Sequence, residues 1–180
     1  MSELPANRVE APDPATATAR QRDVMDRLIA KRGKVLIPYK IWLHAPGVAE
    51  GMEALGTHLN TASSLSAAER ELVVLATVVH WDSPFPIRGH TKHALAAGLQ
   101  PEIVDGLIAR RPVAPEAPRL AAIARLTAAS LAGQSTDDAA FDDYATQIGR
   151  EGMAEVVALI GYFTAVALAM RLHDVRPKPE

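Results

Sequence analysis

Residues 68–107 read AERELVVLATVVHWDSPFPIRGHTKHALAAGLQPEIVDGL, and this stretch decides the fold class. Just before it, Ser66 stands three residues ahead of Glu69, which is the spacing of a capping box at a helix start. The apolar run ELVVLATVV then continues this helix, and proline and glycine positions mark the helices that follow. The stretch predicts three consecutive helices, over residues 66–80, 83–97 and 101–111.

Helical periodicity continues on both sides of this stretch. Upstream, Val48, Met52, Leu55 and Leu59 repeat at the spacing of one helix face. No segment alternates with a period of two over a useful length, so no strand is expected. The fold class predicted is therefore all-α. The further helices expected run over residues 15–33, 39–44, 46–59, 120–131, 141–148 and 152–173.

The length of 180 residues fits one domain. Residues 1–14 carry three prolines and are expected to form an extended arm, residues 15–176 a single helical domain, and residues 177–180 a tail. The predicted last helix is apolar nearly all round, which favours a place in the core or in a subunit interface. Its charge-free part, residues 156–170, is too short to span a bilayer, so neither a membrane segment nor a membrane partner is expected.

Composition excludes several classes of function. The formal net charge is −2 and the basic residues are dispersed, so nucleic-acid binding is not expected. The chain contains no cysteine, which excludes disulfides, thiolate metal sites and thiol nucleophiles. The N-terminal residues lack the apolar region of a secretory signal, so a cytoplasmic location is expected.

Polar candidates for chemistry gather where the first two helices of the central stretch meet. Glu71 interrupts an apolar helix, and His90 and His93 are spaced to share a face of the next one. Each also has a structural interpretation, as a solvated carboxylate, a hydrogen-bonded histidine or a packed ring. The candidates are Glu71, His80, Trp81, Asp82, Arg88, His90 and His93.

The central stretch resembles the signature region of the carboxymuconolactone decarboxylase / alkylhydroperoxidase-D-like family. KRGKVLIPYKIWLHAPGVAEGMEALGTHL (residues 31–59) is similar to the family's N-terminal helices, and EVVALIGYFTAVALAM (residues 155–170) to its last helix. The resemblance covers roughly residues 20–175. It implies a compact orthogonal helical bundle that assembles as a homo-trimer or homo-hexamer, with active sites near subunit boundaries.

The peroxidase branch of this family uses a Glu, a Cys-x-x-Cys pair and a His. Glu71 and His90 match the Glu and the His, but the two cysteine positions fall on Ser83 and Pro86, and an additional His of that branch falls on Phe85. The peroxidase cycle needs one thiolate to attack the peroxide and a second thiol to resolve the sulfenic acid. Neither serine nor proline does this, so thiol peroxidase activity is excluded.

The decarboxylase branch lacks the cysteine pair, and Trp81, Phe85 and His90 are in register with it. Pro86 stands where that branch usually has a Glu, which indicates a changed substrate or reaction. The resemblance therefore implies a lyase or isomerase without a cofactor or metal. Its substrate would be a small carboxylated lactone or keto acid, as in the breakdown of aromatic compounds.

In this hypothesis His90 is the general acid and base, because imidazole gives and takes protons near neutral pH. Glu71 fixes its tautomer, and Arg88 holds a substrate carboxylate. The other residues expected to bind substrate are Trp81, Phe85, His80 and His93.

Two alternatives stay open at this stage. His90 and His93 with a carboxylate from Glu71 or Asp82 would make a two-His, one-carboxylate metal site. Alternatively, the lost cysteines and the lost Glu indicate a family member without enzymatic activity, which binds a small ligand or acts through its oligomer.

Overall fold

The computed structural model describes residues 8–177, and within this range it contains nine α-helices and no strand. The all-α prediction is confirmed. Residues 1–7 of the predicted arm and residues 178–180 of the tail lie outside the described residues. The helices are α1 (Ala19–Arg32), α2 (Ile37–Trp42), α3 (Pro46–Thr61), α4 (Ala67–His80), α5 (Pro84–Ala96), α6 (Pro101–Ile108), α7 (Pro118–Leu131), α8 (Asp138–Gln147) and α9 (Gly149–Leu172).

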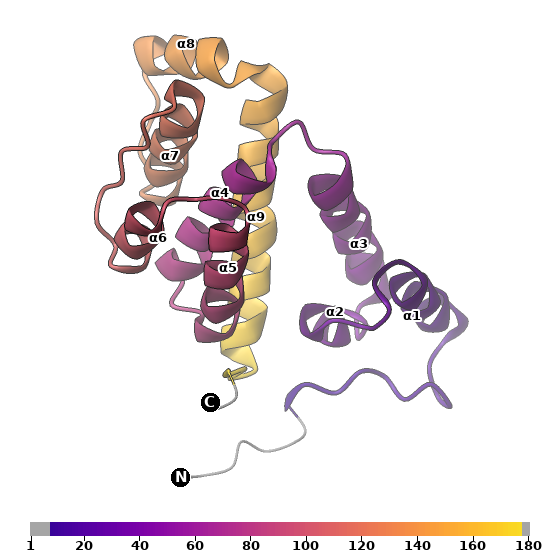
Figure 1. The fold of residues 1–180 in the computed structure, drawn as a ribbon. Helices are drawn as coiled ribbons and strands as arrows, with labels where there is room; N and C mark the ends of the chain where they lie inside the picture. Colours follow the sequence, from indigo (N-terminus) through magenta and orange to yellow (C-terminus); the bar gives the residue numbers. More distant parts are fainter. Residues whose placement is uncertain (1–7, 178–180) are drawn as a thin grey trace.

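Helices α4 and α9 form the centre of the molecule (Figure 1). Helix α4 contacts α5, α6, α7 and α9, while α9 also contacts α7, α8, α3 and α2. In Figure 1, α1–α3 lie together on one side of α9, and α5–α7 lie on the other. The N-terminal α1–α3 group therefore meets the rest of the bundle along α9.

The start of α4 is fixed as the sequence predicts. Ser66 and Glu69 form the capping box, with the Ser66 amide donating to Glu69 Oε2 at 2.8 Å and the Glu69 amide donating to Ser66 Oγ at 3.3 Å. Arg119 Nε donates to Glu69 Oε1 at 2.8 Å, which ties the start of α4 to α7. Beyond the cap, the apolar face of α4 fills the core with Leu72, Val73, Leu75 and Val78, all fully buried.

The turn between α4 and α5 is held from two sides. Arg110 Nη2 donates to the carbonyl of Val79 at 2.8 Å, and Arg171 Nη1 donates to the carbonyl of Trp81 at 2.7 Å. Asp82 turns the chain with a φ of 48° and also pairs with Arg110. These contacts satisfy carbonyls at the C-terminal end of α4 and set the position of α5 relative to it.

Several predicted boundaries differ from the structure for local reasons. Helix α1 begins at Ala19 instead of Ala15, because Thr18 caps it together with Gln21. Helix α9 begins at Gly149 instead of Gly152.

Ser83 precedes α5, but its side chain makes no capping hydrogen bond. Its hydroxyl is fully buried and has no hydrogen-bond partner among residues 8–177.

Helix α9 is long and apolar enough to cross a membrane by length and composition. This is weak evidence, because the core helix of a soluble protein passes the same test. Val156, Leu159, Val166 and Met170 are buried, and α9 packs against five other helices. These contacts match a place in the core, which is one of the two positions expected from the sequence.

Candidate functional site

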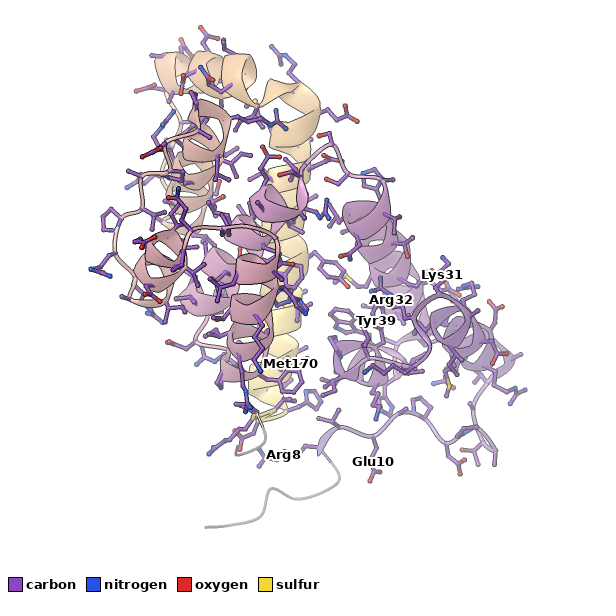
Figure 2. All side chains as sticks on the ribbon, viewed as in Figure 1. Arg8, Glu10, Lys31, Arg32, Tyr39 and Met170 are labelled. Atoms are coloured by element: carbon purple, nitrogen blue, oxygen red, sulfur yellow. The ribbon has the colours of Figure 1, made fainter. Side chains whose placement is uncertain are left out.

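A cavity of about 540 Å³ lies between the N-terminal helices and α4, α5 and α9. One wall comes from residues 32–40 and Asn60, and the opposite wall comes from the other three helices. Figure 2 shows Arg32 and Tyr39 on the side of the N-terminal helices and Met170 near the end of α9. The opposite wall consists of Glu71, Phe85, Pro86, Gly89, His90, His93, Tyr162, Phe163, Val166 and Met170.

Glu71 on α4 and His90 on α5 meet in this wall. Glu71 Oε2 lies 2.8 Å from His90 Nδ1, and each side chain is 19% exposed. An ionised carboxylate only accepts hydrogen bonds, so Nδ1 carries the proton and donates it to Glu71. The other ring nitrogen of His90, Nε2, is therefore left to act as an acceptor or, in the imidazolium, as a donor.

Two rings pack against the imidazole of His90. Phe163 on α9 lies edge-on to it at 5.0 Å between ring centroids, and His93 lies edge-on at 5.3 Å. The contact with Phe163 limits rotation of the His90 ring. His93 is exposed, and its nearest ligand atom lies within 4.8 Å of ligand atoms of both Glu71 and His90. These three residues are thus grouped closely enough to share a cation.

Two tyrosines that the sequence analysis missed face each other in the cavity. Tyr39 on α2 and Tyr162 on α9 are buried, and their hydroxyl oxygens lie 2.9 Å apart. Burial raises the pKa of both phenols above its ordinary value, so both hydroxyls remain protonated at neutral pH. The signal that could have found Tyr162 is its phenol within an otherwise apolar helix, since a buried tyrosine hydroxyl usually has a polar partner.

The wall of residues 32–40 carries three cationic side chains, Arg32, Lys34 and Lys40. Within the described part of the chain, none of them forms an ion pair with a carboxylate, although Arg32 packs 5.7 Å from the centre of the Tyr39 ring. Glu71 is the one carboxylate among the lining residues. The cavity therefore has an excess of positive charge on one side, which favours an anionic ligand.

Four residues predicted for the site line the cavity together, namely Glu71, His90, Phe85 and His93. Trp81, His80 and Arg88 do not line it. His80 is nine residues from Glu71, or half a turn away around α4, and its ring packs on Trp81. Arg88 is two residues before His90, which turns it about 200° away around α5.

Trp81 instead has a structural contact. Its indole Nε1 donates to Thr164 Oγ1 of α9 at 3.0 Å, which joins the end of α4 to the central helix. Arg88 was expected to bind a substrate carboxylate, but it does not line this cavity. The cationic side chains that do line it come from residues 32–40.

The model of the carboxymuconolactone decarboxylase family matches residues 46–129, the segment that contains Glu71 and His90. Over this segment the chain is similar to that family. Comparison with curated proteins finds no match. The family match covers the two helices that carry the Glu71–His90 pair, whereas Arg32, Tyr39 and Tyr162 lie outside it.

Two solved structures share the fold. The crystal structure of an uncharacterized peroxidase-related protein from Silicibacter sp. TM1040 has a TM-score of 0.72 at 16% identity, over 98% of this chain and 93% of that one. A protein of unknown function from Agrobacterium tumefaciens, suggested to be the antioxidant defence protein AhpD, has a TM-score of 0.59 at 17% identity, over 75% and 93%. Both likenesses concern the fold.

Proposed function

We propose that this protein is a lyase or isomerase that acts without a cofactor on a small carboxylated lactone or keto acid. The observation that carries the proposal is the hydrogen bond of 2.8 Å between Glu71 and His90 in the wall of the cavity. Glu71 holds the imidazole in one tautomer, so Nε2 is the atom that exchanges a proton with the substrate. The alkylhydroperoxidase reaction is not proposed, because the chain has no cysteine.

In a decarboxylation, the bond between the carboxylate carbon and its neighbour breaks and carbon dioxide leaves. The electron pair passes into the conjugated carbonyl system of the substrate as an enolate, and the His90 imidazolium then delivers a proton to carbon. Glu71 stabilises the imidazolium before this transfer. The imidazole afterwards regains its proton from water. For an isomerase, His90 would remove a proton from one carbon and return it to another.

The charge of the cavity supports an acidic substrate. Arg32, Lys34 and Lys40 lie in the wall formed by residues 32–40 and have no carboxylate partner in the described range. A bound carboxylate would be attracted to them, and the enolate that forms later would also be stabilised. Pro86 contributes an apolar surface where the decarboxylase branch usually has a Glu, so the substrate is expected to differ from that of the branch.

A second candidate function follows from the grouping of Glu71, His90 and His93 within 4.8 Å. Two imidazoles and one carboxylate form a ligand set that suits a divalent transition metal. In that case the metal would take the place of the Glu71–His90 hydrogen bond, and His93 would be essential. In the proposed acid/base mechanism, by contrast, His93 takes no part in the proton transfer, so its loss should affect substrate binding and leave kcat largely unchanged.

The test is turnover, followed in the ultraviolet, of a series of small lactone and keto acids that begins with 4-carboxymuconolactone, by chelator-treated protein purified without an affinity tag. His90→Ala should lower turnover by roughly 10²–10⁴-fold, the usual contribution of general acid–base catalysis. The matched control is His80→Ala, because His80 is exposed on the opposite face of α4 and should be dispensable.

His93→Ala separates the two candidates. A retained kcat in this variant, with retained activity in the chelated protein, supports the acid/base mechanism. Loss of activity in both, with a bound metal detected by elemental analysis, would favour the metal site instead. If His90→Ala stayed as active as His80→Ala, the assignment of His90 would be wrong. No turnover by the wild type would favour another acid or a ligand-binding role.

A further inference from the structure

The Tyr39–Tyr162 pair has no role in the acid/base step, yet both residues line the same cavity as His90, and their hydroxyl oxygens lie 2.9 Å apart. Two hydroxyl groups carry two protons, and one of these forms the bond between the two tyrosines. The second proton needs an acceptor of its own. Within the described residues, the one other acceptor for the pair is the carbonyl oxygen of Met52, which lies 3.3 Å from Tyr39 Oη.

This bond to Met52 is weak. Hydrogen bonds between a hydroxyl and an oxygen usually measure about 2.7–2.8 Å, so 3.3 Å lies beyond the normal range. The Tyr39 hydroxyl can leave Met52 at little cost and donate to Tyr162 instead. Tyr162 then has its proton free for an oxygen atom in the cavity. The pair can thus donate a hydrogen bond to a ligand oxygen in the cavity. When no such oxygen is present, its second proton goes to the Met52 carbonyl.

The position of Tyr162 relative to His90 is fixed by the ring between them. Phe163 lies edge-on to His90 at 5.0 Å and to Tyr162 at 5.2 Å between ring centroids. All three residues line the cavity, so a ligand that fills it lies against His90 and Tyr162 together. On the other side, Arg32 lies over the Tyr39 ring, so the cationic wall adjoins the hydroxyl pair.

We infer that Tyr162, backed by Tyr39, donates a hydrogen bond to a second oxygen of the bound acid, a carbonyl or hydroxyl oxygen distinct from its carboxylate. The site thereby selects oxo or hydroxy acids over acids that lack this oxygen. This inference rests on the proposed function, because it takes the ligand to be a small acid. Burial keeps both phenols protonated, as a donor requires.

The selectivity has a physical cause on the protein side. With an acid that lacks the second oxygen, the pair keeps its long bond to the Met52 carbonyl and gains no hydrogen bond to the ligand. An acid with this oxygen accepts the Tyr162 proton, and the complex gains one net hydrogen bond. Sites that hydrogen-bond a ligand oxygen discriminate against the analogue that lacks it more strongly than apolar pockets discriminate by size.

Titration calorimetry with two acids tests the inference. The probes are 4-oxocyclohexanecarboxylate and cyclohexanecarboxylate, which share the carboxylate and the ring and differ in one carbonyl oxygen. The wild type should bind the oxo acid about fivefold more tightly, as one net hydrogen bond allows. Tyr162→Phe should bind both acids equally and keep wild-type affinity for cyclohexanecarboxylate. The matched control is Tyr144→Phe on α8, a buried tyrosine outside the cavity, which should keep the preference.

Tyr39→Phe provides a second variant. It should partly reduce the preference, because Tyr162 then receives no hydrogen bond from Tyr39. A preference for the oxo acid that survives in Tyr162→Phe, or no preference in the wild type, would overturn the inference while leaving the proposed function standing. If the wild type bound neither acid, the anionic ligand of the proposed function would itself be refuted, and the inference with it. Melting curves of each variant establish that it is folded before binding is compared.

Discussion

Glu71 and His90 touch through a 2.8 Å hydrogen bond, although they are nineteen residues apart and lie on different helices. Each keeps 19% of its side chain exposed, so the pair is neither sealed in the core nor free in solvent. The bond joins the second turn of α4 to the middle of α5, and the turn held by Arg110 and Arg171 sets the two helices side by side. The geometry of the pair thus depends on contacts well outside the cavity.

Glu71→Gln tests whether the charge of Glu71 contributes to catalysis in addition to its hydrogen bond to His90. The amide is the same size as the carboxylate but carries no charge to stabilise the imidazolium. We expect turnover of the substrate to fall by roughly 10–10³-fold with little change in substrate binding. The measurement is kcat and KM for Glu71→Gln beside His90→Ala. A change in KM alone would contradict the stabilisation of the imidazolium by the Glu71 charge.

Gly56→Ala should displace the Tyr162 side chain and so disturb its hydrogen bond to Tyr39. A Cβ atom at Gly56 would lie 2.6 Å from Tyr162 Oη and 2.9 Å from Cζ, so the ring would have to move. We expect the free energy of unfolding to fall by about 1–3 kcal/mol. The control is Gly51→Ala on the same helix, where a Cβ meets nothing within 4 Å. Gain of helix propensity should stabilise this control by about 0.5–1 kcal/mol. Chemical denaturation measures both, and equal effects would refute the close approach.

Glu155 should make stability depend on pH in the acid range. Burial alone raises the pKa of this carboxyl, but hydrogen bonds from Ser64, Ser63 and His58 outweigh it and hold the pKa below its ordinary value of 4.5. A lowered pKa in the folded protein means that the charged form contributes stability above pH 4.5. This contribution is lost as the pH falls through the lower, folded-state pKa.

The measurement is the free energy of unfolding of wild type and Glu155→Gln between pH 3 and pH 7. At pH 7 the variant should be less stable by about 1–3 kcal/mol, because it leaves buried donors imperfectly paired. The difference should shrink progressively as the pH is lowered below 4.5. Glu151→Gln, exposed on the same helix, should show no such dependence. A difference independent of pH would show that the charge of Glu155 contributes nothing.

Ser83→Ala should stabilise the protein. The Ser83 hydroxyl is fully buried and unpaired within the described range, and it does not cap α5. Removing it eliminates the desolvation penalty of an unsatisfied polar group, so thermal denaturation should show a gain of about 1 kcal/mol. A clear loss of stability would mean that the hydroxyl has a partner in solution.

The oligomeric state expected from the family resemblance, a homo-trimer or homo-hexamer, stays a prediction. Val157, Leu168 and Leu172 are exposed apolar residues on α9, with 56%, 44% and 78% of their surfaces accessible in the single chain. Light scattering coupled to size exclusion should give three or six times the 19.2 kDa of one chain. Leu168→Glu should shift this mass downward if α9 forms the interface. A wild-type mass of 19.2 kDa would refute the prediction.

The fold was predictable because its signals are local. The capping box of Ser66 and Glu69, the apolar period of α4 and the glycine after α5 each act within a few residues. The same holds for the Glu71–His90 pair, since consecutive antiparallel helices bring their faces together. Boundaries were less predictable where a side chain caps the helix, as Thr18 does for α1.

The second half of the cavity was not predictable from local patterns. Tyr39 and Tyr162 are 123 residues apart, and their contact depends on how the N-terminal helices dock against α9. Arg88 was the anion-binding residue expected from its closeness to His90 in sequence. Around α5, however, two residues of separation place it away from the cavity, and the cations come from a distant segment.

Because the cavity lies between α1–α3 and the rest of the bundle, a ligand that fills it makes contacts with both parts at once. Ligand binding and the docking of α1–α3 are therefore thermodynamically linked, each strengthening the other. The Lys31–Glu53 ion pair, 2.7 Å long, joins α1 to α3. Neither residue lines the cavity, but the pair helps to hold α1–α3 together as the unit that supplies one of its walls. Amide exchange in residues 32–40 should slow on binding, which makes this segment a reporter for screening ligands.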